Sequence, residues 1–406
     1  MYFFLVFLIS ITLLGSVTVG PFSIRVYSTV MMFAYLLYSC NSCKYVQIDR
    51  SFLKTYVVFL VLMGFSQFLI NEIMEYEYFK KLLAYHFVCI VAFWAIERYI
   101  NNRKELSKAI LVLTAVMLFN NVITILQFLG NDIGWSIGML FGDIQNNMDF
   151  ADSHDSLLGY SRTPGIFGNV VNNAFAIAVL CPLSLCFFNN GIKTMLKVVV
   201  SASMVIALVA CFMTQQRAAF GLMLFCVCLY LYVEFRKNVV LFIFTCILVF
   251  IFGSDLNISE IDMGRFADAS NDSRNNFYKL AIIFISENPI FGGPIAYQRL
   301  TYGYTSHNVI LDSWIAAGLF GFAAMMSLFV KTIWTGVKTL YKGVVTYNQD
   351  RFMIFCSLAV LNAMFYGLTH NTSYLAGNVI NFIVLALMLK IISISRSFTG
   401  NDASQI

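Results

Sequence analysis

The chain has 406 residues, of which 59 % are hydrophobic and only 12 % are Asp, Glu, Lys or Arg. A soluble domain carries about 45–50 % apolar and about 25 % charged residues, so this chain has too little charge to cover a water-facing surface of its size. The composition excludes a soluble enzyme, a nucleic-acid-binding protein and a disordered chain, and it predicts a protein whose main solvent is lipid.

Twelve apolar segments follow one another along the chain. A membrane-crossing helix needs about 20 apolar residues, so they predict an all-α polytopic integral membrane protein with about 12 transmembrane helices in a single transmembrane domain, 1–406. No basic residue precedes the first segment and no small-residue cleavage site follows it, so we expect a spanning helix there rather than a removed signal peptide. The segments are 2–19, 22–40, 52–71, 82–97, 109–129, 170–189, 197–213, 218–235, 239–253, 308–330, 352–369 and 377–395.

The basic residues are spread unevenly over the loops between these segments. Seventeen of the 26 Lys and Arg residues lie on one set of alternate loops, and nine lie on the other set. Basic residues concentrate on cytoplasmic loops, so we expect the richer set, and with it both termini, in the cytoplasm. The net charge of +5 follows from this distribution and needs no nucleic-acid partner.

Two long loops are expected on the opposite, external side of the membrane, at 130–169 and 254–307. Long loops in a compact protein are commonly functional. The second loop contains N-cap candidates at Asp272 and Ser273, and apolar residues from Phe277 onward recur at helical spacing. This pattern predicts a short amphipathic helix that lies on the membrane surface.

The cysteines and histidines indicate no metal or redox centre. All ten cysteines lie in or beside apolar segments and none in the two long loops, which argues against a disulfide framework. Cys40 and Cys43 form a lone CxxC with no second cysteine pair, and small apolar helix residues explain it better than redox work. The four histidines are dispersed, so we expect no metal and no other cofactor.

Two arginines on the external side are candidates for binding an anion. Arg217 follows Thr214, Gln215 and Gln216 in a short turn between two apolar segments, and Arg274 begins the amphipathic helix. A guanidinium offers two parallel hydrogen bonds and a permanent charge, and a helix N-terminus adds N–H groups and a positive dipole end. The alternatives stay open: Arg217 as an interfacial snorkelling side chain and Arg274 as a solvated surface charge.

One histidine is placed for proton transfer. His307 opens the tenth apolar segment directly before Asn308, and histidine can act as a general base near neutral pH. A polar helix-cap residue is the alternative. His370, at the external end of the eleventh segment, is a rival on chemistry alone. His154 is typical of an ordinary loop residue, and His86 is interpreted as a buried polar residue between helices.

Two further charged residues are weighed for the same site. Arg162 precedes Thr163, Pro164 and Gly165, which predict a bend into the sixth span, and it could also join an external anion site. Asp312 lies one turn into the tenth span. An acid inside a membrane span is by default a functional hypothesis, although pairing with a neighbour is common.

Two stretches before residue 220 resemble motifs of the O-antigen ligase and polymerase superfamily of membrane proteins. Arg162-Thr-Pro-Gly-Ile-Phe-Gly-Asn169 is similar to that family's Arg…Gly-x-x-Gly-Asn entry to a span. Thr214-Gln-Gln-Arg217 resembles its Thr-x-Ser/Thr-Arg turn, with Gln216 where the family often has Ser or Thr.

Two later stretches continue the resemblance. The run from Ser273 through Gly293 resembles the family's Arg-x-x-x-(Trp/Tyr) helix that ends in Pro-x-x-Gly. The run from Ser306 to Gly321 resembles its His-Asn-x-x-Leu…Gly-x-x-Gly segment. The likeness spans residues 160–325, and it rests on order, spacing and external placement, since no single motif is specific.

The resemblance implies a GT-C-like, metal-independent glycosyltransferase in the bacterial inner membrane, with its active site on the periplasmic face. It implies that His307 activates an acceptor hydroxyl. It further implies that Arg217 and Arg274 hold the diphosphate of an undecaprenyl-diphosphate-linked oligosaccharide and stabilise it as the leaving group. The flanking pattern favours His307 over His370. The substrate-binding residues expected around them are Arg162, Asn308, Tyr278 and Arg299.

Three functions remain open on the sequence. A polymerase, the preferred one, joins lipid-linked repeat units, and a chain-length regulator and a repeat-unit flippase would be its partners. A ligase transfers the finished glycan to lipid A-core. The short interval from Arg274 to His307 and the segment 160–174 favour the polymerase. The third function is a flippase or another transporter, in which polar residues gather near the bilayer midplane.

Overall fold

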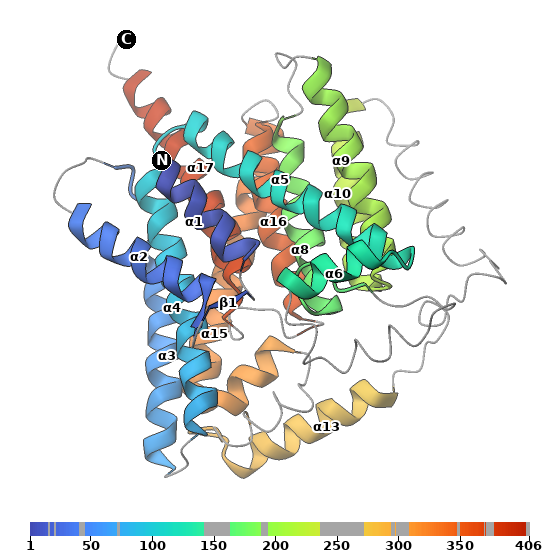
Figure 1. Ribbon diagram of the computed structural model, residues 1–406. Helices are drawn as coiled ribbons and strands as arrows, with labels where there is room; N and C mark the ends of the chain where they lie inside the picture. Colours follow the sequence, from blue (N-terminus) through green and yellow to red (C-terminus); the bar gives the residue numbers. More distant parts are fainter. Residues whose placement is uncertain are drawn as a thin grey trace.

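The computed structural model describes residues 1–14, 17–19, 22–39, 45–70, 74–141, 163–187, 194–235, 272–293, 297, 308–346, 350–368, 370 and 377–402. These residues fold almost entirely into helices, most of which run side by side (Figure 1). Their buried apolar side chains form one core that includes residues from the first helix to the last.

The first half of the chain supplies six helices and a minimal antiparallel strand pair, in which Thr18 lies opposite Ser23 and Val19 opposite Phe22. These elements are α1 (Tyr2–Thr12), β1 (Thr18–Val19), β2 (Phe22–Ser23), α2 (Ile24–Tyr38), α3 (Ser51–Leu69), α4 (Tyr76–Tyr99), α5 (Arg103–Phe128) and α6 (Asp132–Phe141).

The second half adds the helices that carry most of the candidate residues. These elements are α8 (Val170–Leu180), the 3₁₀-helix η3 (Cys181–Phe187), α9 (Thr194–Met213), α10 (Arg217–Phe235), α13 (Asp272–Glu287), α15 (Val309–Tyr341), the π-helical turn η4 (Lys342–Thr346), α16 (Arg351–Gly367) and α17 (Val379–Asp402).

The helices confirm an all-α membrane protein, while the number of twelve spans stays a prediction. Segment 239–253 lies outside the described residues, and each of the other eleven apolar segments overlaps a helix. By length and composition, six described helices can cross a membrane; five more are apolar but shorter. The six are Ser51–Leu69, Tyr78–Tyr99, Arg103–Phe128, Val170–Phe187, Val309–Val345 and Val379–Arg396.

The expectation of one helix over residues 2–19 is wrong at its C-terminal end. Helix α1 ends at Thr12, and Thr18 and Val19 lie in strand β1. The sequence Val17-Thr18-Val19 is β-branched throughout, and Pro21 cannot donate a backbone hydrogen bond to a continuing helix. The 11 helical residues rise only about 17 Å, which is shorter than the hydrocarbon core of a bilayer.

Other boundaries move outward. Helix α4 begins at Tyr76, six residues before the apolar segment at 82–97, so this span is not short. Helix α15 continues eleven residues beyond the predicted end at residue 330. The two extensions include Lys80 in α4 and Lys338 in α15. A long basic side chain can lie along an apolar helix and place its charge at the membrane boundary, so these lysines do not end the helices.

The segment formed by α8 and η3 lies in the middle of the bundle and is buried on nearly every side. Pro182 has no N–H, so it cannot bond to the Ala178 carbonyl four residues earlier. Asn362 on α16 donates its Nδ2 to that carbonyl oxygen at 2.7 Å. A neighbouring helix thus supplies the hydrogen bond that the proline removes, which is how a proline is tolerated inside a membrane helix.

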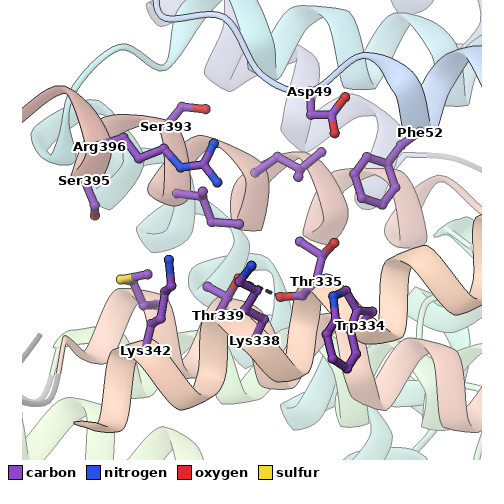
Figure 2. Close-up of a pocket in the computed structure, with 13 residues that line it drawn as sticks. Asp49, Phe52, Trp334, Thr335, Lys338, Thr339, Lys342, Ser393, Ser395 and Arg396 are labelled. Atoms are coloured by element: carbon purple, nitrogen blue, oxygen red, sulfur yellow. Dashed lines mark hydrogen bonds between the residues drawn. The ribbon is translucent and has the colours of Figure 1, made fainter. Parts of the chain in front are cut away.

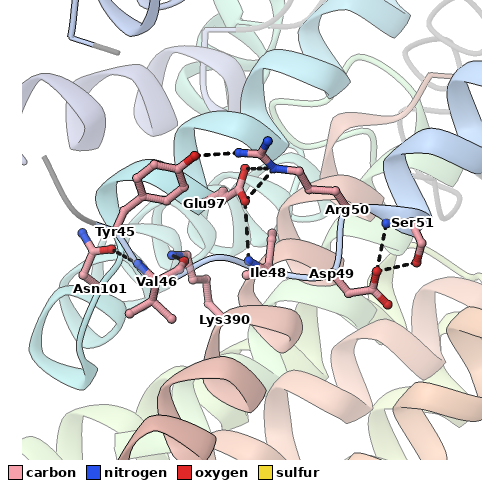
Figure 3. A network of polar contacts seen from close by, with 9 residues as sticks. All are labelled: Tyr45, Val46, Ile48, Asp49, Arg50, Ser51, Glu97, Asn101 and Lys390. Atoms are coloured by element: carbon pink, nitrogen blue, oxygen red, sulfur yellow. Dashed lines mark hydrogen bonds and ion pairs between the residues drawn. The ribbon is translucent and has the colours of Figure 1, made fainter. Parts of the chain in front are cut away.

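A polar network fixes the segment before α3 against α4 and α17 (Figure 3). Arg50 Nε donates to Glu97 Oε1 at 2.9 Å, and Lys390 Nζ donates to the Val46 carbonyl oxygen. The hydrogen bond to Glu97 raises the pKa of Arg50. Glu97 and Lys390 are buried, so each charge has a polar partner where water is scarce.

The first residues of α1 and the last turns of α17 lie at one end of the bundle, and helix α13 lies at the opposite end (Figure 1). Helix α13 runs across the lower end of the molecule and packs against α15. Its Ala281 is buried, whereas Ile282 and Ile283 are exposed. The helix predicted inside 254–307 is therefore present, with apolar residues both against the bundle and on its outer side.

Candidate active site

The segment that follows Arg162 is held by buried amide side chains. Asn173 on α8 donates its Nδ2 to the Thr163 carbonyl oxygen at 2.9 Å, and Asn120 on α5 accepts the Ile166 N–H at 3.0 Å. Asn120 also donates to Asn173 Oδ1 at 2.8 Å, which joins the two amides. Since both asparagines are fully buried, the chain next to Arg162 has a fixed position.

Gly165 lies at the centre of this network. Its N–H donates to Gln127 Oε1 at 2.8 Å, and its carbonyl oxygen accepts from Gln127 Nε2 at 3.1 Å. Its φ is +58°, and a Cβ there would lie 2.4 Å from Asn120 Oδ1. Only glycine fits this turn, both because of its backbone conformation and because of the close amide.

The same segment contacts the turn that carries Arg217. Thr163 Oγ1 donates to the carbonyl oxygen of Met213, the last residue of α9, at 3.3 Å. Arg217 follows four residues later as the first residue of α10, and its side chain is exposed. The structure therefore brings the segment after Arg162 to the turn before Arg217.

The turn itself has an uncommon backbone. Gln215 has φ 55°, and it is the single residue other than glycine with a positive φ in the described part of the chain. The left-handed backbone conformation costs about 1–2 kcal/mol for a residue that has a Cβ. Thr214 supports the turn through its Oγ1, which donates to the Cys211 carbonyl oxygen at 2.7 Å. The strained turn ends α9 and begins α10 within three residues, which places Arg217 at a helix N-terminus.

A second assembly forms where the chain after α13 inserts into a break in α15. Gly318 has φ 62° and ψ −163°, which interrupts the helix. The break leaves backbone groups without intrahelical partners, and residues 289–293 supply them. Gly293 N–H donates to the Ile315 carbonyl oxygen at 2.7 Å, and Leu319 N–H donates to the Pro289 carbonyl oxygen at 3.0 Å.

The glycines of this assembly are required by close approach. A Cβ on Gly318 would lie 2.0 Å from the Ile290 carbonyl oxygen, and one on Gly292 would lie 2.5 Å from Gly318 N. The Trp314 ring adds a hydrogen bond from Nε1 to the Pro289 carbonyl oxygen at 2.9 Å. The Pro-x-x-Gly and Gly-x-x-Gly motifs of the sequence are thus two sides of one contact.

The first turn of α15 gives Asn308 a clear structural role. Asn308 Oδ1 accepts the N–H groups of Ile310 and Leu311 at 2.9 and 3.4 Å, so it caps the helix. His307 comes directly before this cap. Asp312, one turn further on, is buried as expected of an acid inside the helix.

A buried tyrosine anchors the chain two residues before Arg299. Tyr297 is buried, is hydrogen-bonded to Tyr78 of α4, and lies near Asp312. Burial first, and then the neighbouring Tyr78 and Asp312, raise the pKa of the Tyr297 hydroxyl well above its ordinary value. The hydroxyl stays protonated and can donate a hydrogen bond at any physiological pH.

The structure describes only some of the predicted site residues. Arg162, Arg299 and His307 lie outside the described residues. Arg274 lies in the first turn of α13, as expected from its N-cap candidates. Tyr278 is half-buried one turn later on α13. Arg217 and Asn308 have the positions given above.

The remaining histidines have structural surroundings. His86 is buried and its Nδ1 contacts the Tyr56 hydroxyl, which confirms a polar residue between helices. His370 is buried and stacks on Tyr366 with ring centroids 4.6 Å apart. In the described part of the chain, no group of three His, Cys, Asp or Glu residues could hold a metal ion.

Sequence reasoning missed the amides that hold the site. Asn120 and Gln127 lie inside the apolar segment 109–129, where a buried polar residue needs a partner. Their position inside an apolar segment was a signal that they have hydrogen-bond partners. The sequence could not identify these partners, Ile166 and Gly165, because a long loop separates them from α5. Helix α6 was also missed: it lies in the expected loop 130–169.

The described site therefore belongs to a helical membrane protein with two motif assemblies, one around Arg217 and one at the break in α15. Residues 202–326 match the model of a protein family described as O-antigen ligase. This match confirms the resemblance to the O-antigen ligase and polymerase superfamily, a glycosyltransferase-like family that acts on lipid-linked glycans in a membrane. It covers Arg217, Arg274 and His307, whereas Arg162 lies before it. No curated protein matches the chain.

Proposed function

We propose that the protein is an O-antigen polymerase that joins undecaprenyl-diphosphate-linked repeat units at the periplasmic face of the inner membrane. The observation that carries the proposal is the position of Arg217, exposed at the N-terminus of α10 within the stretch that matches the family. A helix N-terminus next to a guanidinium is well suited to a diphosphate.

The reaction needs no energy source besides the donor. His307 accepts the proton of the acceptor sugar hydroxyl, whose oxygen attacks the anomeric carbon of the donor. The bond between that carbon and the diphosphate oxygen breaks, and undecaprenyl diphosphate leaves with the electron pair. Arg217 and Arg274 stabilise the negative charge that develops on the leaving group, which is where fixed cations lower a barrier most.

The two assemblies support this division of roles. The amide network holds the segment after Arg162 at the Arg217 turn. The α15 break holds residues 289–293, which follow the C-terminal end of α13, and Arg274 lies in the first turn of that helix. Both groups of residues thus depend on a rigid support, as a site that must hold its reacting groups in a fixed geometry requires.

The ligase remains the closest alternative, since both enzymes use the same donor and differ in the acceptor. The short interval from Arg274 to His307 and the character of segment 160–174 favour the polymerase. A transporter is favoured by one observation, the broken helix α15, because transporters often bind substrate at such breaks. Here residues 289–293 already bond to the groups that the break exposes, which argues against a substrate there.

Deletion of the gene in its native host, followed by gel analysis of the surface lipopolysaccharide, tests the proposal. We expect core that carries one repeat unit and no ladder. Bare core with long lipid-linked glycan would make the protein a ligase, and bare core without that polymer would make it a flippase. An unchanged ladder would contradict all three functions in a host with no second copy. Plasmid-borne wild type should restore the ladder, while the Arg217→Ala, Arg274→Ala, His307→Ala triple variant should not.

A further inference from the structure

A pocket lies at the other end of α15, far from the candidate active site. It has a volume of about 200 Å³ and lies between the start of α3, the last turns of α15 and the end of α17 (Figure 2). Lys338 lies 19 residues beyond Leu319, where α15 resumes after its break, and this corresponds to about 28 Å along the helix. The pocket therefore lies at the end of the helices that the sequence assigns to the cytoplasm.

Three cationic side chains face this pocket. Lys338 and Lys342 come from α15 and η4, and Arg396 comes from α17 (Figure 2). Among the described residues, Lys338 and Lys342 form no ion pair. The one acid in the lining is Asp49. The pocket therefore has a clear excess of positive charge.

Asp49 does not neutralise these three cations, because another lysine pairs with it. Lys331 Nζ lies 3.4 Å from Asp49 Oδ2, and Ser51 donates its backbone N–H to Asp49 Oδ1 at 2.9 Å. Partial burial opposes the charge on Asp49, but the hydrogen bonds from Ser51 and the nearby Lys331 outweigh it and lower its pKa.

The buried hydroxyl group of Ser395 is a second observation that indicates a ligand. Ser395 lines the pocket and is only 6 % exposed, and its Oγ has no hydrogen-bond partner among the described residues. A buried polar atom without a partner costs about 1–3 kcal/mol, so such atoms usually bond to water, an ion or a ligand. The hydroxyl and the three cations together form a set of donors suited to phosphate oxygens.

The outer surface of α15 beside the pocket is apolar. Its exposed large side chains recur every three or four residues and so form one stripe, which we call the α15 stripe. It consists of Val330, Trp334, Val337 and Tyr341 of α15 and continues to Val345 of η4. Trp334 also lines the pocket, and it is 68 % exposed. Tryptophan and tyrosine are typical of the membrane–water boundary, so the pocket opens where lipid headgroups lie.

We propose that this pocket binds the phosphate of an anionic membrane lipid, whose acyl chains lie along the α15 stripe. Lys338, Lys342 and Arg396 bind the phosphate oxygens, and Ser395 donates a hydrogen bond. A soluble phosphate would satisfy the same donors, but it would leave the adjoining stripe without a role. Basic pockets between transmembrane helices on the cytoplasmic side bind anionic headgroups in this way. The inference does not depend on the proposed function, because the two sites share no residue.

Native mass spectrometry of the delipidated full-length protein tests the inference. Dioleoyl phosphatidylglycerol is titrated against the wild type, and dioleoyl phosphatidylcholine serves as the zwitterionic lipid. We expect one phosphatidylglycerol to bind more tightly than the rest. The triple variant Lys338→Gln, Lys342→Gln, Arg396→Gln should bind it at least about tenfold more weakly, because three charge-assisted contacts are lost. Ser395→Ala should weaken it less.

The control variant Lys54→Gln, Lys104→Gln, Lys108→Gln removes the same charge from exposed lysines on the same expected face, and it should bind like the wild type. Equal loss in both variants would mean that only the overall charge matters, which overturns the site. Unchanged binding in the Lys338, Lys342, Arg396 variant would overturn it too. Displacement of the lipid by equimolar inorganic phosphate would assign the pocket to a soluble phosphate and contradict the lipid.

Discussion

Asn173 donates a hydrogen bond from its side chain to the Thr163 carbonyl oxygen, 2.9 Å away, and the two residues come from opposite ends of the bend that enters α8. Thr163 in turn bonds to Met213 at the end of α9. One buried amide thus connects the chain after Arg162 with the turn that presents Arg217. The support of the candidate site is a set of hydrogen bonds inside the membrane bundle.

We expect Asn173→Ala to lower both stability and polymer formation. The change leaves the Thr163 carbonyl and Asn120 Nδ2 with fewer partners, which costs about 1–3 kcal/mol. The control is Asn172→Ala, one residue away on the exposed side of α8. Thermal unfolding in detergent and the lipopolysaccharide ladder are measured together. If both variants unfold at the same temperature as the wild type, the amide network does not hold this segment.

Arg217 provides the most direct test of chemistry. Arg217→Ala should abolish the ladder, while Arg217→Lys should leave a weak one, because lysine keeps the charge but loses the paired hydrogen bonds to a diphosphate. The loss for alanine should be at least about 100-fold in rate. Rates are measured with lipid-linked repeat units in vesicles. Lys108→Ala, at the other end of the bundle, should match the wild type; full activity of Arg217→Ala would exclude a catalytic arginine.

Gly318→Ala should separate the end of α13 from α15. The added Cβ would lie 2.0 Å from the Ile290 carbonyl oxygen, and its backbone conformation is essentially restricted to glycine. The expected cost is about 1–3 kcal/mol, seen as a lower melting temperature and faster proteolysis near α13. Gly64→Ala is the control, since nothing lies within 4 Å of its Cβ position in α3. It should be neutral or slightly stabilising.

Asn362 donates a hydrogen bond to the Ala178 carbonyl oxygen, which Pro182 leaves without its helical partner. We therefore expect the effects of mutating Asn362 and Pro182 on stability to be non-additive. Asn362→Leu alone should destabilise the protein by about 1–3 kcal/mol, because the Ala178 carbonyl loses its partner. In a Pro182→Ala background the new N–H can bond to Ala178, so the same change should cost less. A double-mutant cycle on melting temperature measures this difference. If the stability changes of the two single variants simply add up in the double variant, the Asn362 hydrogen bond does not replace the missing helix hydrogen bond.

The sequence was sufficient for the helical membrane class and for most element positions. Long apolar runs must form helices in lipid because backbone groups need partners there, so eleven of the twelve segments overlap a described helix. The two N-cap candidates also placed the start of α13 correctly to within one turn, because the helix begins at Asp272. The exception is the end of α1, where β-branched residues and a proline turned the chain into strands.

The tertiary structure decided what the motifs do. Gly292 and Gly318 could be recognised as family-like residues in the sequence, yet their close contact appears only when the chain after α13 meets α15. The cap that Asn308 forms on α15, by contrast, is local. Asn120 and Asn362 carried no motif at all. The physical reason is that local patterns fix where a helix begins and which residues are apolar. The partner of a buried polar group, by contrast, depends on which helix packs beside it.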